Sequence, residues 1–348
     1  MNINDLLEFA FQSGASDLHI SAGLPPMVRV DGDIRRVGGD NAMVLTKETA
    51  QDLVYDVMKD NIRKIFEETS EADFSIDLPN VCRFRVNVFK QERGMSAVFR
   101  QIPSRVMTLD DLNLGNTFKN LASLPRGIVL VTGPTGSGKS TTLAAMIDYI
   151  NKSYSHHILT IEDPIEFVHT SQKSLINQRE VHRDTLSFNN ALRAALREDP
   201  DVILVGEMRD RETIQLALSA AETGHLVFGT LHTNSASKTI DRIIDVFPGD
   251  EKSMIRSMLS ESLQGVVCQN LLKKTGGGRV AAHEIMIGTP AIRNLIREDK
   301  VAQMYSTIQT GAKDGMITMD KSLQELMIKG IITKEDARHK AKEKAMFA

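Results

Sequence analysis

The sequence predicts a two-domain protein in which a small α+β domain precedes a larger α/β domain. The chain has 348 residues, which is the length of about two domains of ordinary size. Short runs of alternating apolar and polar residues recur in residues 1–101, a pattern typical of strands with one exposed face. After Gly127, continuous apolar runs alternate with helical stretches, as parallel strands buried between helices do.

The composition excludes several classes of protein. The chain is 41% apolar and 25% charged, with a net charge of −3 and no tryptophan. It is an ordinary globular chain without the basic, aromatic-bearing composition of a nucleic-acid motor, so we expect no nucleic-acid partner. Its two cysteines, Cys82 and Cys268, are too few for a four-cysteine zinc site and favour a reducing, cytoplasmic compartment. No apolar stretch approaches the roughly 18 residues that cross a bilayer, so we expect no membrane span.

The first domain is predicted to contain two helices and a sheet of short strands. Residues 4–13 and 47–68 have helical apolar spacing. Residues 27–37 form two short runs joined by Asp31-Gly32, which predicts a hairpin. Three further strands are expected at residues 72–77, 82–90 and 95–102.

The middle strand of these three has a charged face. Phe84, Val86 and Val88 alternate with Arg83 and Arg85. Because successive side chains of a strand point to opposite faces, we expect the apolar residues to face the core and both arginines to face the other side. The alternative interpretation of these arginines is an ordinary solvated sheet face.

A linker and then the α/β domain follow. Residues 102–125 carry two prolines and no long period, so we place the linker there and the second domain at 126–348. After about residue 250 the strand pattern fades, and we expect helices at 254–272, 291–299 and 322–330. Before that point strands are expected at 128–132, 157–163, 201–207 and 226–232, and helices near 140–151, 187–198, 210–222 and 236–245.

A glycine-rich motif follows the first strand of the second domain. Residues 133–140 read GPTGSGKS, which fits the phosphate-loop pattern G-x-x-x-x-G-K-S between a strand and a helix. The glycines let backbone N–H groups surround phosphate oxygens, and the helix points its positive end at them. Lys139 is expected to reach the β- and γ-phosphates and Ser140 to hold Mg²⁺. The expected ATP-binding residues are Gly133, Pro134, Thr135, Gly136, Ser137, Gly138, Lys139, Ser140 and Thr141.

Acidic residues follow the next predicted strand. Glu162, Asp163 and Glu166 stand at its end, with Pro164 in the turn. Because the carboxyl ends of parallel strands line the ligand crevice, we expect these carboxylates to bind Mg²⁺ through water or to orient the attacking water. We assign Asp163 to the metal and either Glu162 or Glu166 to the general base. The alternative is solvated charge in a loop.

Glu207 directly follows the run DVILVG. A carboxylate at this place in a phosphate-loop fold usually coordinates Mg²⁺ or its waters. No Asp ends the strand, which departs from the commonest form of the motif. The alternative is a glutamate that only caps the next helix.

Two histidines flank the last buried strand. His225 precedes it and His232 follows it. A histidine beside a γ-phosphate can sense the phosphate and relay its presence to a neighbouring subunit, and we assign this role to His225 before His232. The alternative is a structural histidine.

These four clusters, in this order and spacing, resemble the bacterial secretion ATPase superfamily, which carries a Walker A loop, an Asp box (TIEDPIEF), a Walker B strand (DVILVGE) and a His box (TGHLVFGTLHT). Residues 14–36 and 291–311 are similar to the start and to the characteristic C-terminal motif of its type IV pilus retraction ATPases. The resemblance covers nearly the whole chain. It implies a PAS-like N-terminal domain, a RecA-like P-loop ATPase domain with C-terminal helices, and a homohexamer with ATP between subunits.

The same resemblance implies a function. It describes an ATP-hydrolysing motor that acts on an inner-membrane pilus platform protein, from the cytoplasmic side, and powers pilus retraction and twitching motility. Pilus assembly and type II secretion ATPases are longer and carry a four-cysteine metal site, and this chain has two cysteines, which favours retraction. The alternatives are a paralogous accessory retraction ATPase (itself a possible partner), a RecA-like nucleic-acid motor, and a nucleotide-dependent scaffold that hardly hydrolyses ATP.

In such rings, arginines of the N-terminal domain reach the nucleotide on the RecA-like domain, where they stabilise the charge of the transition state. The residues that match this description are Arg83, Arg85 and Arg100, with Arg93 in the turn before the last strand. Arg209 and Arg242 are secondary candidates from the second domain.

Overall fold

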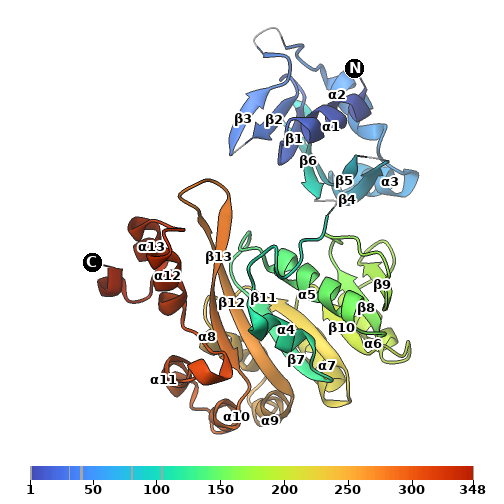
Figure 1. Cartoon of the computed structure of the whole chain (residues 1–348). Helices are drawn as coiled ribbons and strands as arrows, with labels where there is room; N and C mark the ends of the chain where they lie inside the picture. The colour runs from blue at the N-terminus through green and yellow to red at the C-terminus, as the bar shows by residue number, and fades with distance from the viewer. Residues whose placement is uncertain (1, 31, 40–41, 80, 103–104, 348) are drawn as a thin grey trace. The chain divides into compact units, whose positions relative to one another are not determined.

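The structure of the chain is a computed structural model that describes residues 2–30, 32–39, 42–79, 81–102 and 105–347. The chain separates into two compact units, Met1–Arg105 and Val106–Ala348. Figure 1 labels the helices and strands of both units. None of the helices among the described residues is long and apolar enough to cross a membrane.

The first unit is an antiparallel sheet with helices, as the mixed pattern of residues 1–101 predicts. Its described residues form six strands in the order β3-β2-β1-β6-β5-β4, and neighbouring strands are antiparallel. Strands β2 and β3 pair as the predicted hairpin, while Asp31 of its expected turn lies outside the described residues. The elements are α1 (Ile3–Gln12), β1 (Asp17–Ser21), β2 (Met27–Val30), β3 (Asp33–Arg36), α2 (Lys47–Tyr55), α3 (Asp60–Thr69), β4 (Glu71–Leu78), β5 (Cys82–Gln91) and β6 (Gly94–Ile102).

The prediction of a single helix over residues 47–68 is wrong. Helix α2 ends at Tyr55, and α3 begins at Asp60 after Lys59 adopts an extended backbone with ψ 155°. An extended residue interrupts the series of helical hydrogen bonds, so the apolar spacing continues across two helices instead of one.

The core of the first unit lies where the alternation of β5 predicts it. Phe84, Val86 and Val88 are buried and pack in one cluster with Leu7 of α1 and Val54 of α2. One face of the sheet is therefore covered by helices, which leaves the alternate residues of β5 to the other face.

The second unit contains a mostly parallel sheet. Its described residues form seven strands in the order β13-β12-β7-β11-β10-β8-β9. Strand β13 is antiparallel to β12, and the other neighbours are parallel. The elements are α4 (Asn116–Ala122), β7 (Gly127–Thr132), α5 (Lys139–Ser153), β8 (His157–Glu162), β9 (Leu175–Glu180), α6 (Phe188–Ala195), β10 (Val202–Val205), α7 (Arg211–Glu222), β11 (Leu226–Leu231), α8 (Ala236–Asp245), α9 (Lys252–Ser262), β12 (Leu263–Lys273), β13 (Arg279–Ile287), α10 (Pro290–Arg297), α11 (Met304–Thr310), α12 (Met319–Ile328) and α13 (Lys334–Lys340).

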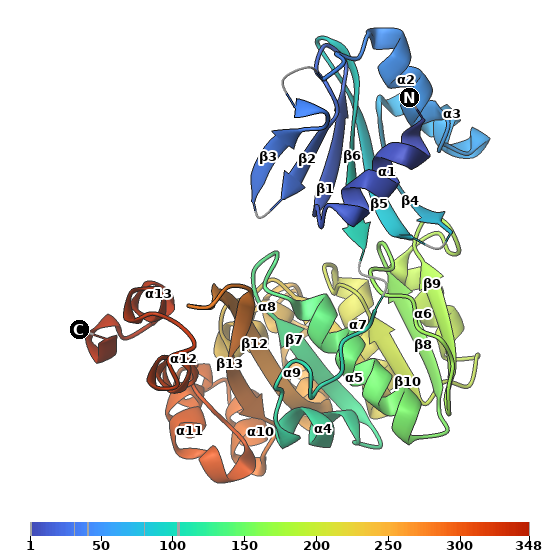
Figure 2. The same cartoon turned by 45° about the horizontal axis from the view of Figure 1, so that its top comes forward.

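Helices cover both faces of this sheet, and α5 lies in front of it in Figure 2. Within β7, Ile128 and Leu130 pack in one core with residues of α6 to α9, whereas Val129 and Val131 pack in another with α4 and α5. All four side chains are fully buried. This two-sided burial explains why the strand is an unbroken apolar run.

The prediction of a helix over residues 254–272 is wrong in its second half. Helix α9 ends at Ser262, and β12 continues the chain as a strand that lies beside β7. Its central residues Val266, Val267 and Cys268 are buried between strands and helices. Pairing with β7 decides the conformation there, because tertiary contacts override a short apolar spacing that also fits a helix.

Part of the expected linker belongs to the second unit. Phe118 and Leu121 of α4 are buried and pack in the same core as Leu143 and Ile147 of α5. Proline and polar residues on both sides hide this short helix in the sequence, because seven residues are too few to establish a helical period.

Truncation of a side chain tests this attachment of α4. Phe118→Ala is expected to lower the free energy of unfolding of the second unit by about 3–5 kcal/mol, because it removes a buried aromatic ring. Urea denaturation followed by circular dichroism measures the change. The matched control is Asn120→Ala on the exposed side of α4, which should change the stability by no more than about 0.5 kcal/mol. Equal urea midpoints for the two variants would contradict this packing.

Candidate active site

Neighbouring parallel strands end at one edge of the second unit's sheet and bring the predicted motifs together. Thr132 at the end of β7 lies beside Leu231 at the end of β11. On the other side of β11, Val205 at the end of β10 lies beside Gly229 and Ile161. The segments that continue from these strand ends therefore meet at this edge, and they contain the phosphate loop, His232, Glu207 and Glu162.

The phosphate loop has a backbone that requires glycine at defined positions. Gly133, Gly136 and Gly138 have φ of +143°, +76° and +89°, in a region that side chains with a Cβ rarely adopt. A Cβ on Gly133 would stand 2.3 Å from the carbonyl oxygen of Gln269, and one on Gly138 would stand 2.8 Å from Gln269 Nε2. The loop therefore packs directly against strand β12.

Lys139 begins helix α5 and turns back over the loop. Its Nζ donates hydrogen bonds to the carbonyl oxygens of Gly133 at 2.9 Å and Pro134 at 3.1 Å. Burial lowers the pKa of Lys139 below its usual value, although the negative charges of Glu207 and Glu166 oppose this shift. The ammonium group thus lies at the mouth of the loop within the field of two predicted catalytic carboxylates.

Glu207 holds its charge through two basic neighbours. Its Oε1 lies 2.6 Å from Nε of Arg209 and 3.0 Å from Nε2 of His232. Burial raises the pKa of Glu207, but Arg209, His232 and Lys139 outweigh that effect, and the pKa is lowered overall. A carboxylate that stays ionised next to a phosphate loop is suited to hold a cation or its water.

The carboxylates after β8 differ in their surroundings. Glu162 accepts hydrogen bonds from Thr160 Oγ1 at 2.7 Å and Gln178 Nε2 at 3.3 Å. Burial nevertheless raises its pKa to about 7. Asp163 and Glu166 are exposed. Glu162 is thus held in place near its neutral form, whereas the other two carboxylates are open to solvent.

The residues predicted to hold a metal have suitable chemistry. Ser140 lies in the first turn of α5, and the ionised Glu207 follows β10, which ends at the same edge of the sheet as β7. Asp163 lies close enough to add to the raised pKa of Arg209, which the hydrogen bond to Glu207 mainly causes. Hydroxyl and carboxylate oxygens are the ligands that Mg²⁺ prefers. The described residues contain no cluster of three or more His, Cys, Asp or Glu side chains placed to bind a metal by themselves.

His225 does not join this group within the chain. It precedes β11, and its carbonyl oxygen accepts a hydrogen bond from Gly127 N at the start of β7. Its Nδ1 lies 2.9 Å from the carbonyl oxygen of Ala220. The strand between it and His232 spans roughly 20 Å at about 3.3 Å per residue. The expectation that His225 stands beside the phosphate is therefore not met inside a single subunit, whereas His232 lies next to Glu207 at the edge that carries the phosphate loop.

The predicted arginine-bearing face exists in the first unit, and its arginines are paired there. Arg85 binds Asp73 through two hydrogen bonds of 3.2 and 2.7 Å. Arg100 donates from Nε to Asp17 at 2.9 Å, and its side chain is 68% exposed. Arg83 is nearly buried and lies beside Asp77 and Ser75 on β4.

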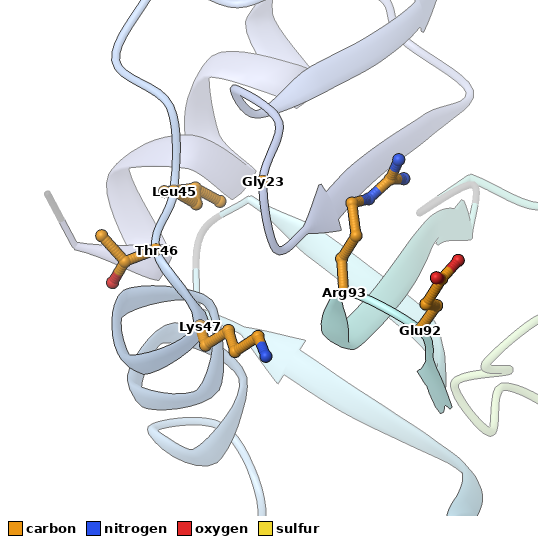
Figure 3. A pocket seen from close by; sticks show the side chains of 6 residues that line it. All are labelled: Gly23, Leu45, Thr46, Lys47, Glu92 and Arg93. Carbon is orange, nitrogen blue, oxygen red and sulfur yellow. The ribbon is translucent and has the colours of Figure 1, made fainter.

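The other candidate arginines differ in their surroundings. Arg93 lines a pocket of the first unit with Lys47 and Gly23 (Figure 3). Arg209 pairs with Glu207 at the site. Arg242 is exposed near the end of α8.

Gln269 and Gln178 are polar residues of this edge that the sequence analysis missed. Gln269 is 2% exposed on β12 and contacts the phosphate loop. Gln178 on β9 donates to Glu162. The available signal for Gln269 was a pair of polar residues, Gln269 and Asn270, inside the otherwise apolar run VVCQNLL, but the sequence pattern of that run also fits a helix.

A parallel sheet with a glycine-rich phosphate loop after β7, a lysine at its mouth and an ionised carboxylate after β10, which β11 separates from β7, defines a P-loop nucleotide-binding domain of the RecA-like type. The family described as "Type II/IV secretion system protein" matches residues 1–338, and the chain belongs to this family.

Known proteins agree with this assignment. The chain is 68% identical over 342 residues to "Type IV pilus retractation ATPase PilT" of Pseudomonas aeruginosa, covering 98% of each chain. It is 63% identical to "Twitching motility protein" of Neisseria gonorrhoeae, covering 91% of this chain and 84% of the relative. The crystal structure of "the Pilus Retraction Motor PilT and Bound ADP" superimposes with a TM-score of 0.92 at 50% identity, covering 99% of this chain and 98% of that one. The chain is therefore an ATPase, as the sequence predicts.

Removal of the loop's cation tests the phosphate site. Lys139→Ala is expected to abolish ATP turnover, because no other side chain in the loop supplies a positive charge to the phosphates. Release of inorganic phosphate by the purified protein measures it. Lys152→Ala, at the other end of α5 where it pairs with Asp148, is the control and should keep wild-type turnover. Normal hydrolysis by Lys139→Ala would show that this loop is not the phosphate site.

Proposed function

We propose that the chain is an ATP-hydrolysing motor that powers retraction of type IV pili and twitching motility. The observation that carries the proposal is the meeting of the phosphate loop, Lys139 and the ionised Glu207 at one sheet edge. Over nearly its whole length, the chain is similar to a protein named a pilus retraction ATPase. This similarity supports retraction of the pilus, and not its assembly, as the process that the motor drives.

In the proposed reaction, this chain's residues position ATP and water. The loop's backbone N–H groups and Lys139 bind the β- and γ-phosphates. Mg²⁺, held by Ser140 and by Glu207 or Asp163 partly through water, would neutralise phosphate charge. Arg209 and His232 keep Glu207 ionised and oriented for this task.

We assign the general base to Glu166. Its negative charge opposes the lowering of the Lys139 pKa, which supports a position near the expected γ-phosphate, and its side chain is exposed. Glu162 is held by Thr160 and Gln178, and burial raises its pKa to about 7. Its role is then to support the loop that carries Glu166.

The motor is proposed to act as a homohexamer at the inner membrane. ATP bound between subunits would meet arginines of a neighbouring first unit, with Arg100 the most available because its side chain is 68% exposed. His225, which lies at the opposite sheet edge from its own phosphate loop, would act across the same boundary. Closing of the two units on hydrolysis would drive a pilus platform protein, on which the ring depends for membrane attachment.

Two matched substitutions test the assignment of the base. Glu166→Gln is expected to lower kcat at least about a hundredfold while affinity for ADP stays near that of the wild type, since only proton transfer is removed. Glu162→Gln is expected to keep most of the activity. Steady-state phosphate release and ADP titration measure both. The opposite pattern would assign the base to Glu162.

The pH profile gives an independent readout. If Glu162 were the base, its protonation below its pKa of about 7 would lower kcat about tenfold for each pH unit as the pH falls. With Glu166 as the base, the kcat profile of Glu162→Gln keeps the shape of the wild-type profile around pH 7. A fall of kcat below pH 7 that occurs in the wild type and is lost only in Glu162→Gln would contradict the assignment of the base to Glu166.

Deletion of the gene in a piliated cell tests the biological direction. Pili are expected to accumulate on the surface without shortening, and the Lys139→Ala chain should not restore shortening. Loss of pili would indicate an assembly motor. Shortening that continues at normal speed would indicate the accessory paralogue, and ATPase activity that rises with added DNA would indicate a nucleic-acid motor.

A further inference from the structure

Gln269 is a buried polar side chain with no part in the reaction described so far. It lies on β12, one residue beyond Cys268, which pairs in register with Thr132 at the end of β7. It therefore stands directly beside the start of the phosphate loop. Its exposed fraction is 2%, and burying an amide in an apolar strand is unfavourable unless both of its ends are hydrogen-bonded.

Both ends of the Gln269 amide are used, and each binds a different part of the nucleotide site. Nε2 donates to the carbonyl oxygen of Ser137 at 2.6 Å. Oε1 accepts from Thr142 Oγ1 at 2.8 Å. Because a carbonyl oxygen only accepts, the Ser137 bond fixes which end of the amide faces the loop. One side chain thus joins the loop to the first turn of α5.

The bond to Ser137 has a consequence for the phosphate side of the loop. In a planar trans peptide the C=O and the following N–H point in opposite directions. Since Gln269 holds the Ser137 carbonyl toward β12, the N–H of Gly138 points away from β12. Such outward N–H groups bind phosphate oxygens.

The glycines of the loop confirm how close this contact is. Any Cβ on Gly133 or Gly138 would stand within 3 Å of the backbone or side chain of Gln269. Gln269 therefore packs directly against the backbone of the loop.

We propose that Gln269 is a positioning residue that sets the affinity for nucleotide phosphates by holding the Ser137–Gly138 peptide with its N–H toward them. The ligand class is a nucleoside di- or triphosphate, so the inference rests on the proposed function. Loss of the amide leaves the Ser137 carbonyl and the Thr142 hydroxyl without their buried partners, and the peptide can then rotate.

The same strand offers a matched control in Gln264. Its Nε2 donates to the carbonyl oxygen of Arg126 at 2.9 Å, and its Oε1 accepts from Arg293. A Cβ on Gly127 would stand 2.5 Å from its side chain. Gln264 therefore repeats the donor, the acceptor and the close glycine, but at the opposite end of β7 from the phosphate loop.

The experiment compares Gln269→Leu with Gln264→Leu in the full chain. A fluorescent ADP analogue measures affinity, phosphate release gives KM and kcat for ATP, and urea denaturation without nucleotide gives stability. Gln269→Leu is expected to bind ADP and ATP about tenfold or more weakly than the wild type. Gln264→Leu is expected to bind within about twofold of the wild type, at a similar loss of stability.

A second pair of variants tests the same role of Gln269 if Gln269→Leu does not fold. Thr142→Val keeps the side-chain volume but removes the hydroxyl that orients Gln269, and it should weaken ADP binding by about threefold or more. Thr142→Ser keeps the hydroxyl and should bind as the wild type does.

The outcomes distinguish a failure of the role proposed for Gln269 from a failure of the proposed function. Wild-type affinity in Gln269→Leu, or equal losses in the two leucine variants, would overturn the role of Gln269 while leaving the proposed function intact. A wild-type chain that binds neither ADP nor ATP would overturn both. Equal ADP binding by Thr142→Val and Thr142→Ser would also contradict the positioning role.

Discussion

Close packing of the phosphate loop against strand β12 is the constraint on which the rest of the site depends. Gly133 and Gly138 approach the strand within a distance that no Cβ allows, so the loop's polypeptide can curl over the end of β7. That curl places Lys139 at the mouth of the loop and starts α5 with its positive end toward the same point. The catalytic groups of neighbouring strands converge on this point because parallel strands share one edge.

Electrostatic surroundings then give the carboxylates at this edge different pKa values. Arg209 and His232 hold Glu207 in its charged form, whereas burial moves the pKa of Glu162 up to about 7. Carboxylates whose pKa values differ in this way can serve different roles. Glu207 is suited to a cation, and Glu162 to a structural or proton-holding place. The exposed Glu166 can then act on water.

The local motifs were predictable, and the residues that tertiary contacts place were not. The phosphate loop, Glu207 and the arginine face follow from glycine spacing and strand alternation, which are properties of a few neighbouring residues. Strand β12 and its Gln269 were missed because a short apolar run fits both a helix and a strand. His225 precedes β11, so a parallel sheet puts it at the amino end of that strand and away from its own phosphate loop, which an assignment from residue type alone did not take into account. His232, at the carboxyl end of that strand, lies 3.0 Å from Glu207.

The central claim is that hydrolysis at this sheet edge supplies the work of retraction. Graded variants of the site, expressed as the sole retraction ATPase of a piliated cell, allow the speed of single retracting pili to be compared with kcat of the same purified chains. The account predicts that speed falls in step with kcat and stops in variants that bind nucleotide without hydrolysing it. Full-speed retraction by a chain that releases no phosphate would contradict it.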